Sequence, residues 1–182
     1  MIDDGQCKAS VGEVRRIAVL GCSGSGKSTL AAALSQKLAL PYVATDPVFW
    51  TEDWRPTPAA AVRAWLAEAV SQARWVTDGN FDNDRDLLWA RADLIVWLDL
   101  PLRVVLAQVL RRNLAWWLRR TPVWGGRRMT LGKAFGGMRH VLHSHGLKHR
   151  AYPAWLAACE PTPVVRLRSR AELADWLASP GR

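Results

Sequence analysis

Short apolar runs alternate along the chain with longer segments in which apolar positions recur at helical spacing. The apolar runs predict strands at residues 15–20, 41–44, 75–77, 94–98 and 164–167. The longer segments predict helices at about residues 27–38, 57–72, 82–91, 101–118, 138–157 and from 169 onward. Strands that alternate with helices form a parallel sheet covered on both faces. The sequence therefore predicts a three-layer α/β fold.

Capping residues and helix breakers indicate where these elements begin and end. We expect Thr57 to cap the second helix, with Pro58 at its first helical position. Residues 169–172 read Ser-Arg-Ala-Glu, a capping-box pattern that opens the last helix. Residues 1–13 are typical of a loose polar tail, and prolines and glycines predict an irregular segment at 119–137. A chain of 182 residues suits one domain, so we expect residues 1–182 to fold as a unit.

A glycine-rich loop follows the first predicted strand. Residues 21–28 read GCSGSGKS and match the pattern G-x-x-x-x-G-K-[ST] throughout. Glycines let the backbone curl so that its N–H groups surround phosphate, and the next helix adds its positive end. Lys27 is expected to reach the outer phosphates, while the Ser28 hydroxyl binds Mg²⁺. The predicted ATP-binding residues are Gly21, Ser23, Gly24, Ser25, Gly26, Lys27, Ser28 and Thr29.

Carboxylates follow three of the predicted strands, at Asp46, Asp78 and Asp99. In a parallel sheet, ligands bind beyond the carboxyl ends of the strands. We expect Asp78 to hold Mg²⁺ together with Ser28, and Asp46 to orient or deprotonate a phosphoryl acceptor. Asp99 has two interpretations, a second metal-side carboxylate or a cap for the helix that opens at Pro101; we favour the cap.

Positive charge is concentrated in one part of the chain. The formal net charge is +9, and residues 100–159 contain no Asp or Glu. A field of one sign implies an anionic partner. We expect Arg111, Arg112 and Arg119 to stabilise charge on a phosphoryl group during its transfer. Arg168, after the fifth strand, is expected either near the adenine or at the surface.

The histidines bear on whether the chain has a structural metal site, and the cysteines on the cellular compartment in which it works. All four histidines lie between residues 140 and 149, and no Cys or carboxylate accompanies them, so we expect exposed residues rather than a structural metal site. The three cysteines are far apart, which favours a reducing compartment. The first 16 residues lack the pattern of a signal peptide, and no apolar run approaches the length of a membrane span. We therefore expect a cytoplasmic protein, a monomer or a homodimer.

Several segments together resemble the adenylate-kinase-like P-loop kinases, and more narrowly the group called DNA topology modulation proteins. They are GCSGSGKSTLAAALSQKL, LPYVATDPVFW, RWVTDGNF, ARADLIVWLDLPLRVVLAQVLRR and VVRLRSRAEL. The resemblance implies a P-loop NTPase fold like that of nucleoside monophosphate kinases, a five-stranded parallel sheet with the loop strand at its centre. It also implies a mobile lid between the fourth and fifth strands, at about residues 111–150. Asp78 takes the place of the carboxylate in the family's D-G-F-P-R element, and Arg111 and Arg112 match its arginine-rich helix end.

The chain departs from that family where adenylate kinases grip a monophosphate. Residues 78–82 read DGNFD, without the proline and arginine of D-G-F-P-R. Arg55 and Arg85 are candidates to replace that arginine, and an acceptor without a phosphate is open. We expect an ATP-dependent small-molecule kinase whose acceptor, a nucleotide, nucleoside or similar hydroxyl compound, lies among Asp46, Phe49, Trp50 and the segment from Asp78. The alternative is a nucleic-acid-binding protein with regulatory ATP, because tryptophans are interleaved with the basic residues.

Overall fold

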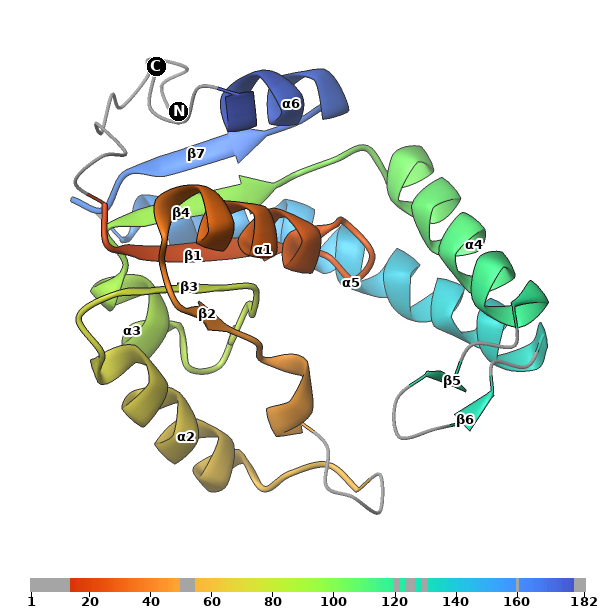
Figure 1. The fold of residues 1–182 in the computed structure, drawn as a ribbon, viewed down its shortest axis with the longest axis horizontal. Helices are drawn as coiled ribbons and strands as arrows, with labels where there is room; N and C mark the ends of the chain where they lie inside the picture. The colour runs from red at the N-terminus through yellow and green to blue at the C-terminus, as the bar shows by residue number, and fades with distance from the viewer. Residues whose placement is uncertain are drawn as a thin grey trace.

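The computed structural model describes residues 14–49, 55–119, 122–123, 127–128, 131–159 and 161–178. Within them, parallel strands form the centre of the molecule: β1 (Arg16–Gly21), β2 (Tyr42–Val43), β3 (Trp75–Thr77), β4 (Leu94–Leu98) and β7 (Val164–Leu167). Their order in this five-stranded sheet is β2-β3-β1-β4-β7, with the strand before the glycine-rich loop in the middle (Figure 1). The predicted three-layer α/β fold with a central loop strand is confirmed.

Alternate residues of β1 enter different cores. Ile17 and Val19 pack in the core beneath α1 (Lys27–Leu38) and α6 (Arg170–Ala178). Ala18 and Leu20 pack on the opposite face, beneath α2 (Ala59–Ser71), α3 (Arg85–Leu88) and α5 (Leu131–Ala157). Successive side chains of a strand point to opposite faces, so a fully apolar strand is what two covered faces require. Figure 1 shows α1 in front of the sheet and α5 behind it.

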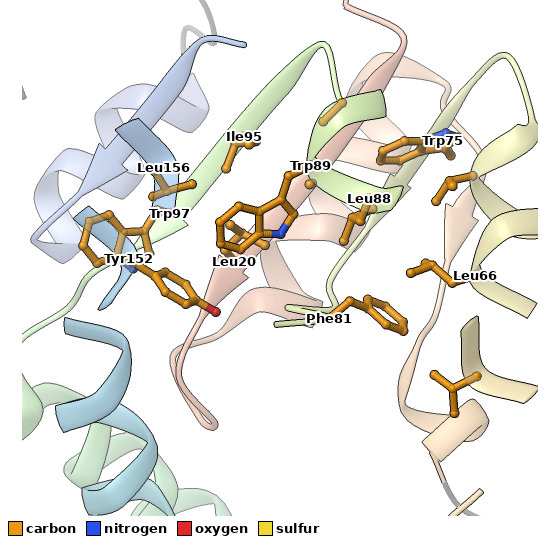
Figure 2. Close-up of a cluster of buried hydrophobic side chains, with 14 residues drawn as sticks. Leu20, Leu66, Trp75, Phe81, Leu88, Trp89, Ile95, Trp97, Tyr152 and Leu156 are labelled. Atoms are coloured by element: carbon orange, nitrogen blue, oxygen red, sulfur yellow. The ribbon is translucent and has the colours of Figure 1, made fainter. Parts of the chain in front are cut away.

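The second of these cores is rich in aromatic rings (Figure 2). Trp75, Trp89, Trp97 and Tyr152 are all at most 1% exposed. Trp89 meets Tyr152 edge-on, with ring centroids 5.5 Å apart, and its Nε1 donates to the carbonyl of Asn80 at 3.1 Å. Large rings with a satisfied polar atom stabilise a core by their area and by their geometry. The chain has 11 Trp against 3 Phe and 2 Tyr, and this high tryptophan content is therefore in part a packing feature.

A third cluster joins the sheet to two long helices. Val105 and Val109 of α4 (Leu102–Leu118) pack with Cys22, Leu100 and Val141. α4 and α5 run side by side away from the sheet, and the short hairpin of β5 (Pro122–Val123) and β6 (Arg127–Arg128) lies at their far end (Figure 1). The predicted apolar face of α4 is buried only in part, because Leu110 and Leu114 are almost half exposed.

Several predicted boundaries were wrong. Pro58, rather than Thr57, occupies the N-cap of α2. The helix expected at 82–91 consists of the single turn α3 and a 3₁₀ turn at Trp89–Arg91. α5 begins at Leu131 instead of 138, and the hairpin occupies part of the segment predicted to be irregular. Glycines at 132, 136 and 137 disfavour a helix by their local preference, but contact between helices can outweigh local preference, and α5 as a whole runs beside α4 (Figure 1).

One ion pair fixes the beginning of the central strand. The Asp93 carboxylate accepts hydrogen bonds from the backbone N–H groups of Arg15 (3.1 Å) and Arg16 (2.9 Å), and from the Arg16 guanidinium at 2.6 Å. Burial tends to raise the pKa of Asp93, but the bonds from Arg16 and Arg15 together hold this pKa below its usual value. The ionised carboxylate therefore stabilises the fold.

We predict that Asp93→Asn lowers the free energy of unfolding by about 1–2 kcal/mol at pH 7, since the pair is partly exposed. The pKa of Asp93 is lower in the fold than in the unfolded chain, so the contribution is complete above about pH 4 and is lost as pH falls through the folded value. The difference in free energy of unfolding between wild type and Asp93→Asn should therefore be smaller in acid than at pH 7. Urea unfolding at pH 7 and at an acidic pH measures this difference. Asp175→Asn, at an exposed carboxylate of α6, is the control. A gap that widens in acid would contradict the account.

Candidate functional site

The loop at residues 21–28, here called the phosphate loop, depends on glycine at three positions. Gly21, Gly24 and Gly26 have φ angles of +151°, +80° and +97°, which side-chain-bearing residues rarely adopt. A Cβ on Gly24 would lie 2.1 Å from Cγ2 of Val109. A Cβ on Gly21 would lie 2.6 Å from Oγ of Ser25. Gly21 and Gly24 thus allow close packing as well as backbone φ angles that other residues rarely adopt.

The same loop has the features of an anion cradle. Gly26 is the N-cap of α1 and has no side chain to cap the first turn, so backbone N–H groups there can face a ligand. Ser25 is 1% exposed, and its Oγ has no hydrogen-bond partner among the described residues. The Lys27 ammonium donates to the carbonyl of Cys22 at 3.0 Å, while Ser28 and Thr29 are exposed. A buried hydroxyl, a helix N-terminus and an ammonium group fit the phosphates of a nucleotide.

The pKa of the Cys22 thiol depends on its burial and on the charges around this loop. The Cys22 thiol is buried, and burial raises its pKa above the usual value. The charges of Lys27 and Lys148 lower the pKa of Cys22 in part.

Asp78 directly follows β3 and is buried among polar groups beside this loop. It is 4% exposed and accepts hydrogen bonds from the Tyr42 hydroxyl at 2.9 Å and the Thr45 hydroxyl at 3.2 Å. Two residues further, Oδ1 of Asn80 accepts the backbone N–H of Gly21 at 2.9 Å. Residues 78–82, here called the Asp78 loop, are thereby joined to the phosphate loop at the carboxyl edge of the sheet. Sequence reasoning did not single out Asn80.

The Asp78 loop contains a strained residue. Phe81 has a φ angle of +46°, unusual for a bulky side chain, and is 5% exposed. Its ring lies 5.2 Å from that of Phe49 and 6.4 Å from that of Trp65, measured between centroids. A Cβ on Gly79 would lie 2.4 Å from Cε2 of Phe81. Such strain persists only where the surroundings hold it, and it is concentrated at functional sites.

Asp99 does not have the capping role expected of it. Its carboxylate accepts a hydrogen bond from Nε of Arg166 at 2.9 Å and contacts Nδ1 of His149 at 3.0 Å. The N-cap of α4 is Pro101, and no side chain caps that helix. Arg166 also lies over the Trp97 ring, 4.3 Å from its centroid. Asp99 therefore holds β7 and α5 at the end of β4.

The arginines expected at the site lie in three different settings. Arg111 and Arg112 belong to the second half of α4, with the Arg112 guanidinium 4.7 Å from the Trp116 ring centroid. Arg119 is exposed at the C-cap of α4. Arg168 is exposed after β7, and its backbone N–H donates to Glu172 at 2.7 Å.

The remaining candidates are placed only in part. Asp46 begins a 3₁₀ turn at Asp46–Phe49, and its side chain and Trp50 lie outside the described residues. Arg85 donates to the carbonyl of Asp82 at 2.6 Å and lies 4.5 Å from the Trp155 ring centroid, so its guanidinium already holds the Asp78 loop. Arg55 is exposed.

The described residues offer neither a cluster of metal ligands nor a membrane-spanning helix. They contain no group of three or more His, Cys, Asp and Glu side chains that could hold a metal ion. Over the same residues, no helix is both long enough and apolar enough to cross a membrane. His145 lies instead 3.0 Å from the carbonyl of Leu100 and stacks on His149 at 5.9 Å between centroids.

In sequence, the chain is similar over part of its length to a protein of Bacillus subtilis. No family model matches it. It is 31% identical over 97 residues to the uncharacterised protein YqaC of Bacillus subtilis strain 168. This match covers 52% of the chain, which spans about half the length of that relative (54%).

In structure, the chain is similar to small-molecule kinases over nearly its whole length. Shikimate kinase from Acinetobacter baumannii, solved with shikimate, has a TM-score of 0.55 at 15% identity, with 94% of this chain and 93% of that one covered. Shikimate kinase from Bacteroides thetaiotaomicron gives 0.56 at 18% identity, with 91% and 95% covered. A gluconokinase from Sinorhizobium meliloti 1021 gives 0.53 at 18% identity, with 92% and 93% covered. The chain therefore has the fold of P-loop kinases; at these identities the likeness concerns the fold alone.

We predict that Gly24→Ala destabilises the chain by about 2–4 kcal/mol, because the new methyl group would meet Val109 at a positive φ angle. Gly146→Ala is the matched control. Gly146 lies inside α5, and a Cβ there meets nothing within 4 Å. That variant should gain about 0.5–1 kcal/mol from helix propensity. Chemical denaturation measures both, and equal effects of the two substitutions would contradict the packing described for Gly24.

Proposed function

We propose that the protein is an ATP-dependent phosphotransferase that acts on a small molecule bearing a hydroxyl or phosphate group. The phosphate loop carries this proposal, because the buried Ser25 hydroxyl and the glycine-capped start of α1 form a cradle for phosphate at the carboxyl end of β1. The kinase fold of the structural neighbours supports it.

On the nucleotide side, residues 21–29 would bind the phosphates of ATP. The Lys27 ammonium donates to the carbonyl of Cys22 in the same loop. Because the lysine side chain is flexible, this ammonium is suited to turn toward the outer phosphates. Ser28 and Asp78 would hold Mg²⁺, which would neutralise charge on the phosphates when bound. Tyr42 and Thr45 orient the Asp78 carboxylate for that role. Arg168 would lie beside the adenine.

On the acceptor side, the Asp78 loop and the 3₁₀ turn at Asp46–Phe49 would enclose the second substrate. Phe49 is 36% exposed and packs against the strained Phe81 with tilted rings, so the exposed part of the Phe49 ring would face an acceptor. Asp46 would orient or deprotonate the acceptor hydroxyl. The Arg85 guanidinium already donates to the carbonyl of Asp82, so it is poorly suited to replace the arginine with which adenylate kinases grip a monophosphate. This favours a hydroxyl acceptor over a nucleoside monophosphate.

The basic α4–α5 region would supply the remaining charge stabilisation. Arg111, Arg112 and Arg119 would approach the transferred group as residues 111–150 close as a lid, which excludes water and prevents hydrolysis. The adenylate-kinase-like assignment, the single domain over residues 1–182, the cytoplasmic location and the monomeric or homodimeric state stay predictions from the sequence.

We predict that Lys27→Ala lowers phosphoryl transfer by at least about a hundredfold, because one donor to a developing charge is lost, and leaves the thermal unfolding curve unchanged. The assay is a screen with ATP·Mg²⁺ against nucleosides, nucleoside monophosphates and small hydroxyl compounds such as shikimate and gluconate. Hydrolysis without acceptor is the background.

Gln36→Ala, at an exposed position of the same helix, is the matched control and should keep wild-type activity. Transfer by Lys27→Ala at the wild-type rate would refute the proposed role of the phosphate loop. Transfer to no compound in the screen would argue against a kinase of this class.

A second candidate is the nucleic-acid-binding protein that the narrower resemblance to DNA topology modulation proteins suggests. The observation in its favour is on α4, where Trp117 and Leu118 are 41% and 64% exposed next to the exposed Arg111 and Arg119. Cations that contact a phosphate backbone and rings that stack on bases require such exposure. This candidate predicts affinity for single-stranded or duplex DNA that falls steeply with added salt, and negligible binding at low salt would exclude it.

A further inference from the structure

One face of α5 carries four polar side chains that all contact the carboxyl edge of the sheet. His145, Lys148, His149 and Tyr152 follow the spacing i, i+3, i+4, i+7, which places them on one side of a helix. His145 contacts the carbonyl of Leu100, and His149 contacts Asp99. Lys148 and Tyr152 reach a different element, the Asp78 loop. The helix therefore joins the end of β4 to the loop that follows β3.

The contact with the Asp78 loop is a closed group of three side chains. The Lys148 ammonium lies 2.6 Å from Oδ2 of Asp82 and 2.9 Å from the Tyr152 hydroxyl. The Tyr152 hydroxyl in turn donates to Oδ1 of Asp82 at 2.7 Å. Burial, and then the charge of Asp82, raise the pKa of Tyr152, so the hydroxyl stays protonated and remains a donor. Figure 2 shows the Tyr152 ring beside Trp89 and Trp97, with its hydroxyl directed away from Trp97.

Asp82 lies at the end of the loop that contains the strained Phe81. The other end is fixed by the bonds from Tyr42 and Thr45 to Asp78, and the middle by the bond from Gly21 to Asn80. A left-handed φ angle at a phenylalanine persists only when its neighbours are held on both sides. Asp82 is the anchor on the C-terminal side, and Lys148 and Tyr152 hold it.

The chemistry of this anchor favours a role in positioning over one in stability alone. Lys148 is 12% exposed and Asp82 36% at the side chain, so both charges lose part of their hydration. An ion pair whose charges lose part of their hydration is weak evidence for stability, since apolar residues of similar volume can stabilise a helix contact as well or better. An ion pair with a bridging hydroxyl does, however, fix direction, because each hydrogen bond requires its own geometry.

We propose that Lys148 is a positioning residue that holds the Asp78 loop in its strained form and thereby determines the affinity for the phosphoryl acceptor. This inference rests on the proposed phosphotransferase function. Lys148 acts through Asp82, which lies four residues after Asp78. The lid-side helix α5 and the acceptor side of the site are thus mechanically joined.

The test compares Lys148→Met with Arg150→Met, which removes the same charge from an exposed position of the same helix. With the acceptor found in the screen, Lys148→Met should raise the KM for the acceptor by about tenfold or more, the size expected for a hydrogen bond to a charged group. The KM for ATP should change less than about threefold, and Arg150→Met should match wild type. Lys148→Arg should restore part of the acceptor affinity, because the ammonium is replaced by another donor.

A second substitution separates positioning from general damage. Asp82→Asn added to Lys148→Met should raise the acceptor KM little further, since the two substitutions remove the same contact between Lys148 and Asp82. Tyr152→Phe keeps the ring in the aromatic core and removes only the donor, so it serves if Lys148→Met fails to fold. A purely structural role would lower the melting temperature without splitting the two KM values. Equal rises in both KM values, or no rise in either, would overturn the proposal.

Hydrogen exchange keeps this proposal distinct from the proposed function. Without any substrate, the backbone amides of residues 79–84 should exchange faster in Lys148→Met than in Arg150→Met, while those of β1 stay protected. Unchanged exchange at 79–84 would overturn the positioning role even if the enzyme is a kinase. A different result is no phosphoryl transfer by the wild type together with faster exchange at 79–84 in Lys148→Met. It would refute the kinase function, and with it the effect of Lys148 on acceptor affinity, but would still support the contact that holds the Asp78 loop.

Discussion

The close approach of the phosphate loop to α4 is the constraint on which the rest of the site depends. Gly24 lies where a Cβ would overlap Val109, and Gly21 lies against Leu98 at the end of β4. Because β1 and β4 are paired from Ile17 to Gly21, the loop, the end of β4 and the start of α4 form one packed unit. The arginines of α4 are therefore positioned by the same packing that shapes the phosphate loop.

A second connection crosses the edge of the sheet in the other direction. Asn80 accepts the backbone N–H of Gly21, so the Asp78 loop and the phosphate loop share a hydrogen bond. Asp82 extends this connection to α5 through Lys148 and Tyr152. Ligands in parallel α/β sheets bind beyond the carboxyl ends of the strands. In this chain, hydrogen bonds connect that region continuously, from the phosphate loop through the Asp78 loop to α5.

Local patterns predicted the sheet and the phosphate loop well. Residues 75–77 and 94–98 are strands as predicted, because buried parallel strands are nearly continuous apolar runs, and the helix at 27–38 matches α1. Contacts between distant residues were not predictable in this way. Asp99 pairs with Arg166, 67 residues away, and Lys148 with Asp82, 66 residues away, so no local pattern reports either pair. The start of α5 was misplaced because its glycines disfavour a helix locally, and the sequence does not show that α5 runs beside α4.

The central claim is that the curled backbone between β1 and α1 binds the phosphates of a nucleotide. The most direct measurement is isothermal titration of the wild-type chain with ATP·Mg²⁺ and, separately, with adenosine. The account predicts saturable binding of ATP·Mg²⁺ at one site per chain and much weaker binding of adenosine, because the phosphates supply most of the contacts. Binding of adenosine as tight as that of ATP·Mg²⁺, or no binding of ATP·Mg²⁺, would contradict it.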